Sequence, residues 1–392
     1  MGQKVSGIPL FSILFAEGTE KKTNWCFREL DYTKLFEFLR YCLDEHQPMP
    51  ECVRDMEWKG VFAWAERQAI LGVIFNKIQN ESNIKMPREL LLKWLAVSEQ
   101  IKQRNTQLNK RCVELTELLQ KEGFRCCVLK GQGNAAYYPN PYSRTPGDID
   151  IYLTLNYVFS NSSQQSQKEK RKKIIQYVRE HYVIGELRYY HVEFETDGVP
   201  VELHFMPCIT NNPVYNRRLQ RWFDDHAEIQ RVELLDGVGQ IPVPTWEFNV
   251  VYQLAHLMHH FFDEGIGLRQ FVDYFYLLKG RTEHTEKTES TLRHLGLWKF
   301  AGAVMYVMRE VFALEEQYMI VPVDERRGKT LLNEILKGGN FGQHSGLTNH
   351  STGGKYFAKT WRNMKLVREY PAEALCEPVF RTWHFFWRLA HR

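Results

Sequence analysis

Short apolar runs in the middle of the chain predict a small β-sheet. Residues Cys127–Leu129 and Ile149–Leu153 are such runs, separated by a glycine-containing turn, a short helical segment and a proline-rich loop. Apolar runs of this length between turn-forming residues are typical of buried strands. Farther along, Arg188–Glu195 and Val199–Met206 alternate apolar and polar residues on either side of Thr196-Asp197-Gly198. This pattern predicts a β-hairpin.

Most of the remaining chain has apolar residues at helical spacing. The predicted helices cover Tyr32–His46, Trp58–Ile78, Glu89–Lys121, Thr245–Phe262, Leu268–Lys279, Leu292–Phe312, Gly328–Leu336 and Phe380–His391. Pro242 and Pro244 predict a linker before the fourth of these helices, and a Gly- and Asn-rich loop is predicted at 337–354. The fold class is therefore α+β, with three regions: an N-terminal helical region (1–100), an α/β core (101–240) and a C-terminal helical domain (241–392).

Alternation along the predicted strands places three acidic residues where they can meet. Asp148 and Asp150 share one side of their strand, and Ile149 and Ile151 share the other. In the later strand, Glu202 lies on the side opposite Val201, Leu203 and Phe205. Carboxylates grouped in this way repel one another unless a cation lies between them. The pattern predicts a site for Mg²⁺, with Mn²⁺ as a substitute, because both prefer oxygen ligands.

Composition narrows the function classes only slightly. The chain has 392 residues, 44% of them hydrophobic and 25% charged, which is ordinary for a folded protein. A net charge of +4 permits an anionic partner such as a nucleotide without requiring nucleic acid. Eight cysteines without a CxxC pair indicate reduced thiols. The apolar run at 8–16 is too short to span a membrane, so we expect a cytoplasmic protein.

Two basic features have an ordinary and a functional interpretation. Lys130 and Gly131 follow the first strand, where a turn and a helix N-terminus can bind phosphate, although an exposed lysine in a routine turn is the simpler interpretation. The segment at 160–173 is polar and then basic. It is most simply a solvated loop leading into a surface helix, and phosphate or RNA contact by Lys168, Lys170, Arg171 and Lys172 is the alternative.

These residues together resemble a known protein family. The similarity rests on the Leu-Lys-Gly turn at 129–131, the Tyr138-Pro139 pair, Arg144, the strand GDIDIYL and the strand VELHF, and it extends loosely into the flanking helices. They resemble the bacterial uncharacterised nucleotidyltransferase family of the DNA polymerase beta-like superfamily. That superfamily uses a Gly-Ser turn to hold nucleotide phosphates, and two aspartates with a third acid to bind metal.

The resemblance implies roles for particular residues. It assigns catalysis and metal binding to Asp148, Asp150 and Glu202. Because Lys130-Gly131-Gln132 stands where the superfamily has Gly-Ser, Lys130 or Gln132 would substitute in phosphate binding. Arg144 could reach a triphosphate or hold a carboxylate in place. His204 could touch the acceptor, orient a carboxylate or be a structural histidine.

Four residues of the C-terminal helices are candidates for a cleft facing these acids. His256, His259 and His260 have the spacing of a zinc pair, but no glutamate occupies the HExxH position, and a core or cleft-lining role is the simpler one for His256 and His260. Arg269 and Asp273 lie one helical turn apart. They would form an ion pair or, inside a cleft, face the substrate.

The sequence thus supports two hypotheses of different classes. The first is a magnesium-dependent enzyme that moves a nucleoside monophosphate from an NTP, such as ATP, to an acceptor hydroxyl with release of pyrophosphate. The acceptor could be a protein, a small molecule, a sugar or an RNA end. The second is a nucleotide-binding or protein-interaction module with little turnover. Under the first hypothesis we expect Asp150→Asn to lower transfer by orders of magnitude and to leave the metal-free protein as stable as its parent or slightly more so.

Overall fold

The computed structural model describes residues 31–155, 164–280, 288–339 and 352–391. Its central feature is a five-stranded sheet in the order β1-β2-β5-β4-β3. The strands are β1 (Phe124–Leu129), β2 (Ile149–Leu155), β3 (Ile184–Leu187), β4 (His191–Thr196) and β5 (Val199–His204). β2 and β5 are parallel, and the other neighbours are antiparallel. The predicted α+β class with a small mixed sheet is confirmed.

A two-stranded sheet lies beside β1. It consists of β6 (Ile229–Leu234) and β7 (Gly239–Pro244), paired so that Arg231 lies opposite Pro242. The prediction of a linker at Pro242 and Pro244 is therefore wrong. Proline is compatible with a strand that has a free edge, since its missing N–H then costs no ladder hydrogen bond. The strand was not evident from the sequence because its proline residues look like loop signals.

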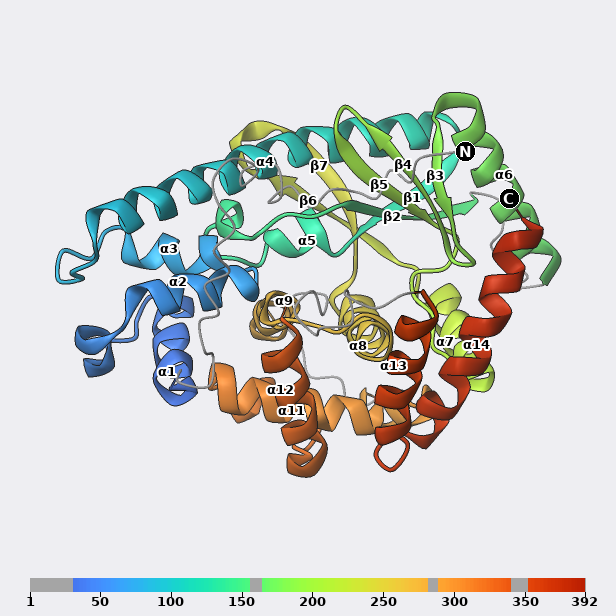
Figure 1. Ribbon diagram of the computed structural model, residues 1–392. Coiled ribbons are helices and arrows are strands. Elements are labelled where there is room, and N and C mark those ends of the chain that lie inside the picture. Colours follow the sequence, from blue (N-terminus) through green and yellow to red (C-terminus); the bar gives the residue numbers. More distant parts are fainter. Residues whose placement is uncertain (1–30, 156–163, 281–287, 340–351, 392) are drawn as a thin grey trace.

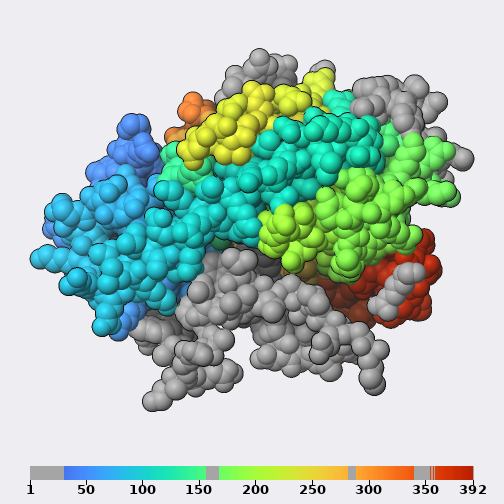
Figure 2. Space-filling view, turned by 90° about the horizontal axis from the view of Figure 1, so that it is seen from above, coloured from blue at the N-terminus to red at the C-terminus, as the bar shows by residue number. Residues whose placement is uncertain are grey.

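One face of the five-stranded sheet is covered by two helices. α4 (Arg88–Lys121) and α6 (Gln164–His181) pack on it, and Figure 2 shows α4 extending along this side of the molecule. Their apolar residues form a core with alternate residues of the strands, among them Leu108, Cys112, Leu115, Ile174, Val178, Ile149, Ile151, Val201 and Leu203. This face is fully apolar, so the polar residues of β2 and β5 are directed to the opposite face.

The opposite face meets the C-terminal helices (Figure 1). A second and larger core connects them to the N-terminal helices and to residues of β1 and β2. The helices of this layer are α1 (Tyr32–Leu43), α2 (Trp58–Arg67), α3 (Leu71–Ile78), α8 (Trp246–Asp263), α9 (Leu268–Lys279), α10 (Thr288–His294), α11 (Trp298–Phe312) and α12 (Glu325–Gly338).

The remaining helices connect these layers or follow them. They are α5 (Gly131–Ala135), α7 (Pro213–Asp225), α13 (Thr352–Lys365) and α14 (Pro371–Ala390). Short 3-10 turns occur at Glu51–Asp55, Pro141–Ser143, Leu235–Gly237 and Glu316–Tyr318. In Figure 1, α14 lies beside α7 and ends near α6. It begins well before the predicted start at Phe380.

Other helix predictions also need correction. The predicted helix Leu292–Phe312 is divided between α10 and α11, because Gly296 between them has a φ of 75°. The predicted helix at 58–78 is broken into α2 and α3, because Ala69 has a φ of 55° and interrupts the helical backbone. Thr245 is the N-cap of α8 as predicted, but its side chain makes no capping hydrogen bond. The segment 1–25 and most of the loop predicted at 337–354 lie outside the described residues.

The predicted division into three regions stays a prediction. α4 continues without interruption through residue 100, and β7 crosses residue 240, so both predicted boundaries fall inside regular elements. The seven described cysteines are free thiols, five of them buried. None of the described helices combines the length and hydrophobicity that crossing a membrane would require.

Candidate active site

The three predicted acids converge at the centre of the sheet. In the parallel pairing of β2 and β5, Asp150 lies directly opposite Glu202, and Asp148 immediately precedes β2. One ligand oxygen from each of Asp148, Asp150 and Glu202 lies within 4.8 Å of the others. The predicted convergence is confirmed, whereas metal binding by these residues stays a prediction.

Two positively charged side chains lie against Asp150. The ammonium Nζ of Lys130 is 3.1 Å from Asp150 Oδ2, and His204 Nε2 is 3.0 Å from Asp150 Oδ1. Burial lowers the pKa of Lys130, but the charges of Asp148, Asp150 and Glu202 outweigh that effect and raise the pKa overall. Lys130 therefore carries a charge that compensates the acids.

His204 is also held in its protonated form. Burial alone would lower its pKa, but hydrogen bonds to Asp150 and to Glu202, whose Oε2 is 3.2 Å from Nε2, raise the pKa of His204 to about 9. Glu202 shows the reverse effect. Burial raises its pKa, and His191, with Nδ1 3.0 Å from Oε2, leads the contacts that bring it well below the usual value. Glu202 is therefore ionised at neutral pH.

Asp148 is the least compensated of the three acids. Burial first, and then the neighbouring charge of Asp150, raise the pKa of Asp148 to about 6, although Lys130 acts in the opposite direction. A carboxylate in this situation gains the most from an added cation.

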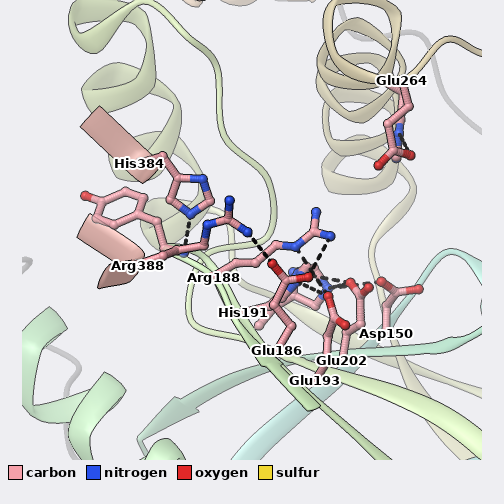
Figure 3. A network of polar contacts seen from close by, with 12 residues as sticks. Asp150, Glu186, Arg188, His191, Glu193, Glu202, Glu264, His384 and Arg388 are labelled. Carbon is pink, nitrogen blue, oxygen red and sulfur yellow. Dashed lines mark hydrogen bonds and ion pairs between the residues drawn. The ribbon is translucent and has the colours of Figure 1, made fainter. Parts of the chain in front are cut away.

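Arg188 connects these acids to the C-terminal helix α14. Its guanidinium lies 3.4 Å from Glu193 Oε1 and 3.1 Å from Glu186 Oε2, and Arg388 of α14 reaches the other oxygen of Glu186 at 2.6 Å. Figure 3 shows Arg188 extending toward Glu193 and Glu202, with Arg388 and His384 to its left, on the side away from Asp150. α14 thus contacts the β3–β4 part of the sheet, and β4 pairs with β5, which carries Glu202.

The sequence patterns did not identify His191, Glu193 or Arg188 as site residues. The register of the predicted hairpin could have located His191 and Glu193. The hairpin pairs Thr196 with Val199, and counting outward from that pair places His191 opposite His204 and Glu193 opposite Glu202. Alternation then puts their side chains on the face that carries the acids. Arg188 lies before β4, outside the residues that pair with β5, so the hairpin register does not place it.

Asp148 and Glu202 line a cavity of about 230 Å³ between the sheet and α8, whereas Asp150 is buried beside them. Its lining includes Lys130, Asp148, Glu202, His204 and, from α8, His256, His259 and His260. His256 Nε2 lies 3.4 Å from Lys130 Nζ and 3.1 Å from His260 Nε2. Burial first and the Lys130 charge second hold the pKa of His256 well below its usual value, so this imidazole is neutral.

The α8 histidines therefore line the cavity as predicted for His256 and His260. Among the described residues, the groups that could hold a metal ion are Asp148–Asp150–Glu202 and His191–Glu202–His204. The histidines of α8 belong to neither group, which agrees with a cleft-lining role rather than a zinc site.

Arg144 and Asp273 form a buried ion pair away from the cavity. The guanidinium donates to both carboxylate oxygens of Asp273, at 2.8 and 2.9 Å, and the Tyr138 hydroxyl donates to Oδ1 at 2.6 Å. Arg144 is only 3% exposed. The pairing favours the structural one of its two predicted roles, namely holding the loop that leads to Asp148. Arg269 donates to the carbonyl of Thr145 in the same loop, at 3.4 Å.

The turn predicted to bind phosphate, Lys130-Gly131-Gln132, begins with a strained backbone conformation at Lys130 and ends with the buried side chain of Gln132. Lys130 has a φ of 36°, a conformation that residues with a side chain rarely adopt, and Gly131 follows with a φ of 51°. The side-chain amide of Gln132 is buried and donates to Asn109 of α4. Of these three residues, Lys130 is the one that lines the cavity.

The donor set fits a hard divalent cation. Asp148, Asp150 and Glu202 offer carboxylate oxygens, which Mg²⁺ and Mn²⁺ prefer. Asp150 Oδ2 is buried and, among the described residues, lacks a hydrogen-bond donor with good geometry, although the Lys130 ammonium lies close to it. A cation bound to this oxygen would therefore displace the Lys130 ammonium.

Comparison with known proteins gives one family and one distant structure. The family described as uncharacterised nucleotidyltransferase matches residues 54–313, which is well over half of the chain and includes all the acids of the site. No curated protein matches the chain. A crystal structure of an antigenic nucleotidyltransferase-like protein from Paracoccidioides brasiliensis is similar at 11% identity and a TM-score of 0.34, over 55% of this chain and 94% of that one.

The family match covers the strands that carry the three carboxylates, the turn at Lys130 and the helix that closes the cavity. Because the match extends over well over half of the chain, the chain belongs to the uncharacterised nucleotidyltransferase family.

Proposed function

We propose that the protein is a magnesium-dependent nucleotidyltransferase that moves a nucleoside monophosphate from an NTP to an acceptor hydroxyl and releases pyrophosphate. The observation that carries this proposal is the convergence of Asp148, Asp150 and Glu202 within 4.8 Å, beside a cavity that Asp148 and Glu202 line, in a chain of this family. A place in the DNA polymerase beta-like superfamily and a cytoplasmic location are parts of the proposal.

Asp148, Asp150 and Glu202 would hold Mg²⁺, or Mn²⁺ in its place. The cation would supply charge neutralisation for the phosphates and for the attacking oxygen. Lys130 and His204 add two positive charges beside the same carboxylates. When a cation takes over the charge of Asp150, the ammonium of Lys130 becomes available for the triphosphate. Catalysis would rest on positioning and on electrostatics without a covalent intermediate.

The first test is ligand-dependent stability. A ligand that binds the folded state raises the melting temperature in proportion to the logarithm of its concentration relative to Kd. We expect Mg²⁺ and an NTP together to raise the melting temperature more than the sum of their separate effects. A panel of NTPs identifies the base. If no NTP shifts the transition with Mg²⁺ or Mn²⁺, the proposal fails.

A second candidate function is a nucleotide-binding or protein-interaction module with little turnover. Two observations favour it: both oxygens of Asp150 already lie beside cationic groups of the protein, and Lys130-Gly131-Gln132 replaces the Gly-Ser turn. The module predicts a thermal shift with an NTP but no release of pyrophosphate with any acceptor. The enzyme predicts both.

A further inference from the structure

A second and much larger concavity lies on the outer side of the sheet, between α6, α7 and α14. This groove has a volume of about 1520 Å³ and is lined along its length by the exposed sides of α6 and α7, by the connection between β3 and β4, and by the end of α14. Pockets for single small molecules usually measure about 300–1000 Å³. The groove is therefore large enough for an extended ligand.

The groove is strongly basic. Six of its lining residues are lysine or arginine, against the two acids Glu180 and Asp224; the six are Lys168, Arg171, Lys172, Arg179, Arg217 and Arg221. Within the described ranges, Lys168, Lys172, Arg217 and Arg221 form no ion pair with a carboxylate. Two helices thus present cations without internal counter-charges, which is the arrangement that attracts a polyanion.

Aromatic rings lie among these charges. The guanidinium of Arg171 lies 4.1 Å from the ring centre of Trp387, and the ring of His391 stacks on the same Trp387 with centroids 4.2 Å apart. Tyr189 meets Trp387 edge to face at 5.9 Å. His391 is exposed and Tyr189 is half-buried, and both line the groove, so they offer ring surface on which a planar base can stack.

The groove and the catalytic cavity share a wall. In the connection between β3 and β4, Arg188 and Tyr190 line the cavity, whereas Tyr189, the residue between them, lines the groove. After β5 the same change occurs between Met206, which lines the groove, and Pro207, which lines the cavity. Arg171 donates to the carbonyl of Arg188 at 3.3 Å and so connects the basic helix to this wall. The thickness of these two connections thus separates a ligand in the groove from the cavity.

We propose that this basic groove binds the acceptor as a single-stranded nucleic acid. The inference rests on the proposed function and names the acceptor class that the function leaves open. Phosphodiester groups would pair with the lysine and arginine residues of α6 and α7, and unpaired bases would stack on Tyr189 and His391. A terminal hydroxyl of the strand would be the attacking group.

The transfer is balanced in atoms and charge. The terminal hydroxyl oxygen forms a bond to the α-phosphorus of the NTP, the bond from that phosphorus to the bridging oxygen breaks, and pyrophosphate leaves. The hydroxyl proton passes to solvent. The strand becomes one nucleotide longer at the end that reacted.

Other polyanions fit the groove less well. An acidic protein or an anionic membrane surface would satisfy the charges but would bring no base to stack on the exposed ring surface of Tyr189 and His391. A duplex would satisfy the charges but keeps its bases stacked on one another. The combination of cations and available rings is typical of proteins that bind single strands.

The test measures binding without catalysis. Fluorescence anisotropy in EDTA follows labelled 20-nucleotide single strands of RNA and of DNA on the full-length protein. The variant Arg217→Ser/Arg221→Ser removes two groove charges from exposed positions. The matched control Lys110→Ser/Lys121→Ser removes two charges from α4, where the side chain of Lys110 is 76% exposed. Thermal melts verify that all variants fold.

We expect the groove variant to raise the Kd for a single strand at least tenfold and to flatten the salt dependence by about 1–2 in slope, because each lost phosphate contact contributes about 0.7 for single strands. The control should match the parent. A preference for RNA or for DNA decides which strand is the acceptor. Equal Kd values for groove variant and control, or equally tight binding of a duplex, polyglutamate or anionic vesicles, would overturn the proposal.

The proposal for the groove and the proposal of nucleotidyl transfer can be refuted independently of each other. The variant Asp148→Asn should bind strands as the parent does, because Asp148 does not line the groove. If strands bind through Arg217 and Arg221 but no NTP yields pyrophosphate, strand binding by the groove is supported and the transfer function is lost. If pyrophosphate is released with a small acceptor while strands bind no better to the parent than to the groove variant, the enzyme stands and the groove proposal is wrong.

Discussion

Asp150 and His204 form a buried hydrogen-bonded pair, with Oδ1 3.0 Å from Nε2. Asp150 is on β2, and His204 is on the neighbouring parallel strand β5. Glu202, two residues before His204 on β5, lies directly opposite Asp150. Because Lys130 lies on the other oxygen of Asp150, the carboxylate is placed between two cations of the protein itself. This arrangement changes what a substitution at Asp150 should do.

Asp150→Asn should lower the stability of the metal-free protein, contrary to the expectation from sequence. The substitution leaves the buried charges of Lys130 and His204 without their nearest partner, and an unsatisfied buried group costs about 1–3 kcal/mol. Urea unfolding in EDTA measures the difference. Asp148→Asn is the matched comparison, since the raised pKa of Asp148 shows that its ionised form is disfavoured, and this variant should be as stable as the parent or more so. Equal stability of Asp150→Asn and parent would contradict the account.

Lys130→Met should be rescued by metal. Without Lys130 the three carboxylates lose a compensating charge, so in EDTA we expect the melting temperature to fall, and saturating Mg²⁺ or Mn²⁺ should close most of that gap because the cation supplies the missing charge. Differential scanning calorimetry with and without metal gives both numbers. Lys110→Met, on the exposed side of α4, should show no metal-dependent difference. If metal does not reduce the difference in melting temperature between Lys130→Met and the parent, the three acids do not bind the metal.

Metal affinity should depend on pH through Asp148. The carboxyl has a pKa of about 6, so it is mostly ionised above pH 6 and protonated below it, and protons compete with the cation for the same oxygen. We expect the affinity for Mn²⁺ to rise as pH increases from 5 to 7 and then to level off. Isothermal titration at several pH values in two buffers also detects the released proton. Asp148→Asn should flatten the profile, and an unchanged profile in that variant would refute the assignment.

The pair Arg144–Asp273 should behave as a structural unit. Removing one partner leaves a buried charge, so Arg144→Met and Asp273→Leu should each cost about 3–5 kcal/mol, while the double variant should cost much less than the sum. Urea unfolding of the four proteins gives the coupling. NTP affinity of the folded double variant separates the two predicted roles of Arg144: affinity close to that of the parent supports the structural role, and a large loss would restore Arg144 as a nucleotide ligand.

Much of the sheet could be predicted because its alternation is strong. The acids, the hairpin at Thr196–Val199 and the apolar residues Val201, Leu203 and Phe205 follow from a period of two, and the structure has all of them. The pairing of β2 with β5 could not be predicted, since many residues separate these strands and nothing local specifies a parallel neighbour. The prolines of β7 concealed a strand that is stabilised by its partner β6.

The site was predicted less completely than the sheet. The carboxylates could be recognised as a candidate metal site because few residue types bind hard cations. Lys130 was predicted to bind phosphate, and its contact with Asp150 in the structure was not predicted. Arg188 and Arg388 act through Glu186, and that contact joins segments about half the chain apart. Long-range ion pairs of this kind depend on tertiary packing, which no local pattern encodes.

Pyrophosphate release in the presence of Mg²⁺ tests the central claim most directly. The parent, Asp148→Asn and Asp150→Asn are compared with a panel of NTPs, single strands and small hydroxyl acceptors, and circular dichroism verifies that each protein is folded. We predict release by the parent, none in EDTA, and a loss of at least about a hundredfold in both variants, because each removes a ligand charge from the site. Release that is equal in parent and variants, or absent from the parent with every NTP and acceptor, would contradict the account.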